Sequence, residues 1–169
     1  MTEVAELDRE DIQIHQDSME GMYLTFELAN EGYGLEIRYV IEIIGIQTVI
    51  KIPDMPEHVI GVLNLRGKVI PVIDVRMRFH LPTREYDDRT CIIVVNVNNN
   101  SVGLVVDNVS EVVDIPEVEI EPPPSVGRGS NPYIQYLGKI AGEVKILLDV
   151  NELIDDDVPG KKISEPEAV

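Results

Sequence analysis

The sequence predicts an all-β protein built as a barrel, and two observations lead to this prediction. Val and Ile dominate the 44% of residues that are hydrophobic, whereas Trp is absent and Phe occurs only as Phe26 and Phe79. β-branched side chains favour strands because a stiff side chain packs well on a pleated surface. The second observation is a regular succession of about nine or ten short apolar segments separated by turn residues, which is typical of a barrel.

The folded part begins with a strand over Met22–Leu28, in which every second residue is strongly apolar. This alternation is expected for a strand that buries one face. Asn30, Glu31 and Gly32 supply a turn, and residues 33–37 return as the partner strand of a hairpin.

The next segment has a different period. Val40, Ile43 and Ile44 follow the spacing i, i+3 and i+4, which predicts a single helical turn. A strand over Gln47–Ile52 is expected to follow it. Pro53 and Pro56 then interrupt regular structure.

Two further strands are predicted over 62–65 and 69–73, joined by a tight turn at Gly67-Lys68. Residues 74–80 form either a short helix or a continuation of the second strand, and we favour the helical turn. Residues 81–89 read as a polar loop.

The second half of the chain repeats the hairpin pattern. Its clearest hairpin joins 90–97 to 101–107 through the triple Asn at 98–100, because Asn adopts positive φ at little cost. Further strands are expected over 109–115, 133–140 and 145–148, with a turn at 142–143 and a helical turn over 150–154. The hairpins near 22–37 and 90–107 suggest a duplicated barrel unit.

The charge is concentrated towards the ends of the chain. The 31 acidic and 14 basic residues give a net charge of −17, of which −6 falls in residues 1–20 and −3 in residues 155–169, leaving −8 for the body. We therefore predict an acidic flexible arm over 1–20, one folded domain over 21–154 and an acidic tail over 155–169. Such a charge repels phosphate backbones and anionic lipids, so neither nucleic acid nor membrane insertion is expected.

Motifs for catalysis or cofactor binding are missing from the sequence. No phosphate-binding loop, His-Glu-x-x-His metal motif or dinucleotide turn occurs. Cys91 is the only cysteine, and it lies in an apolar run where a thiol is normally inert. The histidines at 15, 58 and 80 have no recognisable relation to it. We therefore expect a protein without catalytic residues, metal or cofactor, located in the cytoplasm.

Arg66 is the residue that most needs an explanation. It lies between an apolar segment and Gly67, which is expected to permit a tight backbone turn. One interpretation is structural: Arg66 is held by a carboxylate, for which Glu42 is the natural candidate. The other is recognition, with Arg66 presented as a fixed cation at the edge of a groove. The two interpretations are compatible.

Two stretches carry more apolar side chains than one buried face requires. They are Tyr39–Ile44 and Val109–Val113. Core packing explains any single residue in them. An apolar groove that receives a partner helix would explain the excess in both.

At these residues the sequence resembles the family of chemotaxis coupling proteins, CheW. The resemblance extends in register from Tyr23 to Ile154. Its motifs are Tyr33-Gly34, Val40-x-Glu42-Ile43, Gly61-Val-x-Asn-Leu-Arg-Gly67, Val69-Ile70-Pro71-Val72-x-Asp74, Val102-Gly103-Leu104-Val105-Val106-Asp107-x-Val109 and Ile146-Leu147-x-Asp149.

The resemblance implies two five-stranded SH3-like barrels packed together, with an apolar groove between them. It also implies a non-enzymatic adaptor that couples the cytoplasmic helical hairpin tip of chemoreceptors to the regulatory domain of the histidine kinase CheA. The protein would then be recruited from the cytoplasm to membrane-associated receptor arrays. The length leaves no room for a kinase or receiver domain, so a stand-alone adaptor is expected. The residues we assign to the receptor groove are Val40, Glu42, Ile43, Asn64, Leu65, Arg66, Gly67, Cys91, Val109 and Val112. No kinase-binding residue is assigned.

The same residues fit other classes of protein less well. A single-strand-binding β-barrel needs a basic groove with stacking aromatic residues, and the chain has neither. A small β-barrel enzyme needs a catalytic constellation that the sequence lacks. A small acidic interaction module outside chemotaxis is the remaining alternative.

Overall fold

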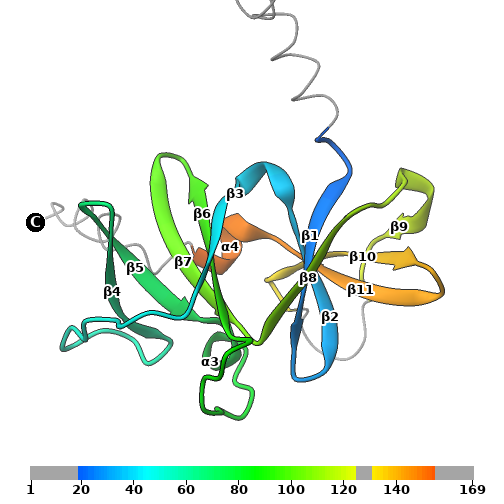
Figure 1. Ribbon diagram of the computed structural model, residues 1–169. Helices are drawn as coiled ribbons and strands as arrows, with labels where there is room; N and C mark the ends of the chain where they lie inside the picture. Colours follow the sequence, from blue (N-terminus) through cyan, green and yellow to red (C-terminus); the bar gives the residue numbers. More distant parts are fainter. Residues whose placement is uncertain (1–18, 125–130, 155–169) are drawn as a thin grey trace, which may run out of the picture.

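The computed structural model describes residues 19–124 and 131–154 of the chain (Figure 1). The predicted arms over 1–20 and 155–169 thus lie almost entirely outside the described residues; Met19 and Glu20 belong to a turn that leads into the first strand. The strands are β1 (Met22–Leu28), β2 (Glu31–Glu36), β3 (Val40–Gly45), β4 (Val59–Leu65), β5 (Lys68–Asp74), β6 (Cys91–Val97), β7 (Asn100–Val106), β8 (Asn108–Asp114), β9 (Ile120–Glu121), β10 (Ile134–Ile140) and β11 (Glu143–Leu148). The helices are the 3₁₀ turns η1 (Ile37–Tyr39) and η2 (Glu117–Glu119) and the short helices α3 (Val75–Arg78) and α4 (Val150–Ile154). None of them is long and apolar enough to cross a membrane.

The strands form two sheets that lie side by side as two barrels (Figure 1). One sheet has the order β8-β1-β2-β11-β10-β9 and the other the order β3-β6-β7-β5-β4. The all-β prediction with two barrels is therefore confirmed. The first sheet holds a sixth, two-residue strand, β9, which the sequence patterns did not indicate.

The predicted helical turn over 40–44 is wrong, because these residues form β3. The 3₁₀ turn lies just before it, at Ile37–Tyr39. β3 pairs with β6 through a register shift between Val40 and Glu42. Along β3, half-buried Val40, Glu42 and Ile44 alternate with exposed Ile41 and Ile43. A polar residue at a half-buried position and aliphatic residues at exposed positions therefore hide the period of a strand in the sequence.

The predicted strand over 47–52 is also wrong. Only Ile50 pairs there, in an isolated bridge with Val62. The helical turn predicted within 74–80 is confirmed as α3, because the Asp74 carboxylate accepts hydrogen bonds from the backbone amides of Arg76 and Met77 and so caps the helix. The turn predicted over 150–154 is confirmed as α4.

The two barrels are copies of one arrangement. Thr25 faces Gly34 in the hairpin β1–β2, and Val94 faces Gly103 in the hairpin β6–β7, 69 positions further along in each strand. The edge strands match as well: Phe26 faces Val109 of β8, and Val95 faces Val40 of β3.

The remaining hairpins correspond with a different offset. Val59 faces Ile73 in β4–β5, and Ile134 faces Leu148 in β10–β11, 75 positions later. Each hairpin is joined in parallel to the other half of its barrel, β5 to β7 and β11 to β2. The duplicated unit suggested by the sequence is thus present in the strand pairing.

The barrels share one hydrophobic core. Its buried side chains come from both sheets and include Phe26 and Leu35 of one barrel and Ile93 and Leu104 of the other. α4 contributes Leu153 to the same cluster. The barrels are therefore held together by apolar packing, which fixes the positions of β3 and β8 relative to each other.

Candidate functional site

The turn between β4 and β5 presents Arg66. Arg66 and Gly67 have φ values of 54° and 85°, so both central residues of this hairpin turn are left-handed. The amide of Gly67 donates to the side chain of Asn64 at 2.9 Å, which fixes the turn from within. A Cβ at position 67 would meet no atom within 4 Å, so the glycine is there for its backbone conformation and not for space.

Arg66 and Glu42 form a bidentate ion pair. Nη2 donates to Oε1 at 2.9 Å, and Nη1 donates to Oε2. The hydrogen bonds from Arg66, with its charge, hold the pKa of Glu42 below its ordinary value. Because β3 and β4 are the two end strands of their sheet, the pair joins the two edges of one barrel.

The pair is asymmetric in its exposure. The side chain of Arg66 is 71% exposed, whereas that of Glu42 is 22% exposed. Glu42 is thus the carboxylate that holds Arg66, as the structural interpretation predicted, and much of the guanidinium is left exposed to solvent.

Aliphatic side chains lie on the edge strands β3 and β8. Val40 and Val109 are half-buried, and both pack against the shared core. Further along, Ile43 is 42% exposed and Val112 is 46% exposed. Exposed aliphatic groups on sheet edges favour association with another chain.

The other predicted groove residues have different surroundings. Leu65 is half-buried and packs on the second core cluster, and Asn64 is exposed near the end of β4. Cys91 lies opposite Gly45 at the far end of β3, and its thiol donates to the carbonyl of Arg89 at 3.3 Å. Ile41, which was not assigned to the groove, is 52% exposed on β3.

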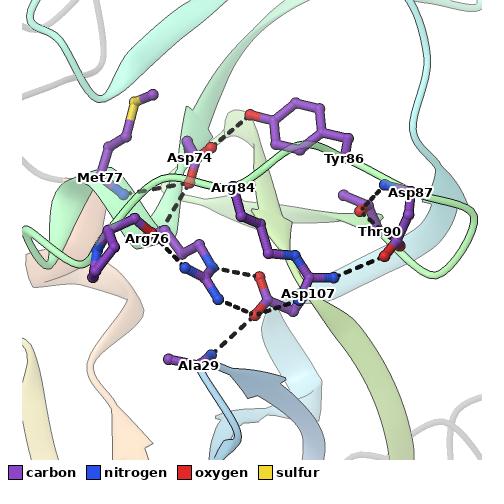
Figure 2. A network of polar contacts seen from close by, with 10 residues as sticks. Ala29, Asp74, Arg76, Met77, Arg84, Tyr86, Asp87, Thr90 and Asp107 are labelled. Atoms are coloured by element: carbon purple, nitrogen blue, oxygen red, sulfur yellow. Dashed lines mark hydrogen bonds and ion pairs between the residues drawn. The ribbon is translucent and has the colours of Figure 1, made fainter.

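A polar network at the junction of the barrels was missed by the sequence reasoning (Figure 2). Its centre is the Asp107 carboxylate, which accepts from Arg76 Nε at 2.8 Å and Nη2 at 2.9 Å and from the amide of Ala29 at 2.9 Å. Ala29 belongs to the β1–β2 turn of the other barrel, so the network ties the two barrels together. The only sign of this network in the sequence is that an aspartate, Asp107, directly follows an apolar strand.

Burial and hydrogen bonding oppose each other at Asp107. Burial raises its pKa, but the hydrogen bonds from Arg76 and Ala29 and the charges of Arg76 and Arg84 outweigh it and hold the pKa below 3.8, the ordinary value. The side chains of Asp107 and Arg76 are each 12% exposed. This ion pair is therefore mostly removed from water.

The loop over 81–89 is fastened to the same network. Arg76 donates to the carbonyl of Pro82, and the Tyr86 hydroxyl donates to Asp74 at 2.5 Å. Burial, followed by the hydrogen bond to Asp74, raises the pKa of Tyr86. Arg84 bridges Asp87 and Asp107 (Figure 2). All these groups bind one another, which indicates a structural role. We call this set of contacts around Asp107 the clasp between the barrels.

The described ranges, 19–124 and 131–154, contain no group of three His, Cys, Asp or Glu side chains that could hold a metal ion. What these ranges do present is a cation held in place by an ion pair on one barrel, and exposed aliphatic side chains on one edge strand of each barrel. Fold and site together define a double β-barrel domain whose candidate site is a surface for another macromolecule.

Comparison with known proteins gives the family. The CheW-like domain family matches residues 22–158. The chemotaxis protein CheW of Klebsiella aerogenes is 37% identical over 136 residues, which cover 80% of this chain and 82% of that protein. CheW of Bacillus subtilis is 31% identical over 135 residues, covering 79% and 86% of the two chains. This chain belongs to the CheW family of chemotaxis adaptor and scaffold proteins.

A solved structure agrees with this assignment. The crystal structure of the scaffolding protein TtCheW from Thermoanaerobacter tengcongensis superposes with a TM-score of 0.75 at 37% identity, and the match covers 80% of this chain and 92% of that one. The barrels are accordingly of the SH3-like type.

Proposed function

We propose that this protein is a non-catalytic adaptor that couples the cytoplasmic tip of chemoreceptors to the histidine kinase CheA. Membership of the CheW family supports a role in chemotaxis signalling complexes. One observation points to a particular surface. Arg66 is held by Glu42 of β3 yet is largely exposed, and β3 also carries the exposed aliphatic Ile43.

The receptor side is proposed to dock on the edge strands. A receptor helix lays the apolar stripe of its surface against Val40, Ile43, Val109 and Val112, which is a helix-in-groove mode of recognition. Burial of exposed aliphatic surface supplies the attraction, at about 25 cal/mol per Å² of apolar area.

Arg66 is proposed to set the register of that helix. Its guanidinium carries five N–H donors, and two of its nitrogens donate to Glu42. The remaining N–H groups are free to donate to polar groups of the receptor. Because Glu42 holds the guanidinium in place, little side-chain entropy is lost on binding.

The kinase is proposed to bind elsewhere on the same domain, so that the protein bridges receptor and kinase from the cytoplasm at the receptor array. No residue is assigned to that contact. Each contact alone is expected to be weak, and an array of linked contacts raises the overall affinity through effective concentration.

Two binding measurements on one preparation test the proposal. Calorimetry of the full chain against a receptor hairpin fragment and against the regulatory domain of CheA should detect both partners, singly and together. If neither binds, the protein is an acidic β-barrel interaction module outside chemotaxis. If both compete for one surface, it does not bridge them.

A further inference from the structure

The duplication of the barrel places a second glutamate where Glu42 lies. Glu111 of β8 is 69 positions after Glu42 of β3, the offset that relates these two edge strands and their partners. β3 has a register shift between Val40 and Glu42, and β8 has one over the matching residues. The flanking positions also match, because Ile43 and Val112 are both exposed aliphatic residues.

The arginine, however, is present in one barrel only. The β10–β11 turn corresponds to the β4–β5 turn, with φ values of 51° and 80° at Ala141 and Gly142 against 54° and 85° at Arg66 and Gly67. Ala141 therefore stands where Arg66 would be. Within the part of the chain that the structure describes, the Glu111 carboxylate has no hydrogen bond and no ion pair, and the residue is exposed.

The backbone of Glu111 is nevertheless held firmly. The hydroxyl of Thr25, a buried residue, donates to the Glu111 carbonyl at 2.8 Å and accepts from its amide at 3.2 Å. A carboxylate on a fixed backbone beside Val112 is arranged like Glu42 beside Ile43, without the cation.

We propose that Glu111 accepts a basic side chain, a guanidinium or an ammonium group, from the receptor helix that docks on β8. The partner would supply in trans what Arg66 supplies to Glu42 within the chain. The inference rests on the proposed receptor-binding function and adds a chemical requirement on the partner. The receptor helix should carry a basic residue next to the apolar side chain that contacts Val112. Asp114, exposed on the same strand, adds to the negative potential there.

Three single variants and one double variant of the full chain test this against a receptor hairpin fragment by calorimetry. Glu111→Gln removes the charge at nearly constant shape and is expected to weaken binding about 10-fold, with a shallower dependence on salt. Ser110→Ala, the adjacent exposed position, should bind like the wild type. Ala141→Arg supplies the missing arginine at a backbone angle that Arg66 already adopts, and is expected to weaken binding by occupying Glu111.

The double variant Glu111→Gln/Ala141→Arg should bind no more weakly than Glu111→Gln, because the added arginine then has no carboxylate to occupy. Thermal unfolding of each variant shows that the fold is kept. If Glu111→Gln binds with wild-type affinity and wild-type salt dependence, this inference is wrong while the adaptor function stands. If the wild type binds no receptor fragment, the proposed function is wrong and this inference falls with it.

Discussion

Arg66 and Glu42 join the two end strands of one barrel, since Glu42 lies on β3 and Arg66 directly follows β4 in the β4–β5 turn. An exposed ion pair adds little to the stability of a fold. The other barrel has the same turn with Ala141 in place of the arginine. The pair is therefore better explained by what Arg66 presents to a partner than by what it contributes to folding.

Arg66→Ala is expected to weaken receptor-fragment binding by about 10-fold or more and to leave the thermal unfolding midpoint nearly unchanged. Calorimetry and a thermal scan measure the two effects. Lys139→Ala is a matched control, because Lys139 forms an exposed ion pair with Glu121 in the other barrel, at 2.8 Å. Unchanged receptor affinity would rule out the assigned groove, and an unfolded variant would show that Arg66 is structural.

Ile43→Asp and Val112→Asp should each abolish detectable receptor binding, because a charge would replace an aliphatic contact at the centre of the docking surface. Both residues are about half exposed, so the fold should tolerate the change. Val144→Asp on β11, similarly exposed, serves as the control for an added surface charge. Equal receptor affinity for all three variants would exclude β3 and β8 as the docking strands.

Asp107→Ala should lower the free energy of unfolding by about 3 kcal/mol, because it leaves Arg76 mostly buried without its partner. Urea unfolding at neutral pH measures the loss. A change below about 0.5 kcal/mol, the size typical of a surface substitution, would contradict the clasp between the barrels.

The contribution of Asp107 should also depend on pH. Its pKa is lower in the folded protein than in the unfolded chain, so the unfolded state binds the proton more tightly. The stabilisation is therefore complete above the unfolded-state pKa, near 4, and is lost as the pH falls through the lower folded-state pKa. The difference in stability between the wild type and Asp107→Asn should shrink over that acid range, and a constant difference would contradict it.

Gly61→Ala should be strongly destabilising, by about 3 kcal/mol, because the backbone strain and the clash at this position act together. Gly61 has a φ of 145°, and a Cβ there would lie 2.2 Å from the carbonyl oxygen of Ile50. Gly45→Ala is the matched control on another edge strand, since a Cβ at Gly45 meets no atom within 4 Å. Similar urea midpoints for the two variants would contradict this account of Gly61.

The sequence predicted the parts of the fold that depend on local pattern. Alternation located Met22–Leu28, and the Asn-rich turn located the β6–β7 hairpin. The sequence-based prediction failed at 40–44 and 47–52. A bulge and an isolated bridge make the strand pairing irregular there, so the spacing of apolar residues does not indicate the secondary structure.

Some contacts of the candidate site could be predicted from the sequence and others could not. The chemistry of Arg66 beside Gly67 was enough to suggest Glu42 as its partner, 24 residues away. Nothing in the sequence indicated that Asp107 meets Arg76 and Ala29, because these contacts depend on how the barrels pack. Glu111 could be identified as the counterpart of Glu42 only from the strand registers of the two barrels.

The central claim is that this protein bridges receptor and kinase, and co-sedimentation with receptor-bearing membranes tests it most directly. CheA should sediment with the membranes when the protein is present and remain in the supernatant when the protein is omitted or replaced by the Arg66→Ala variant. Equal sedimentation of CheA with and without the protein, or a protein that stays in the supernatant itself, would contradict the account.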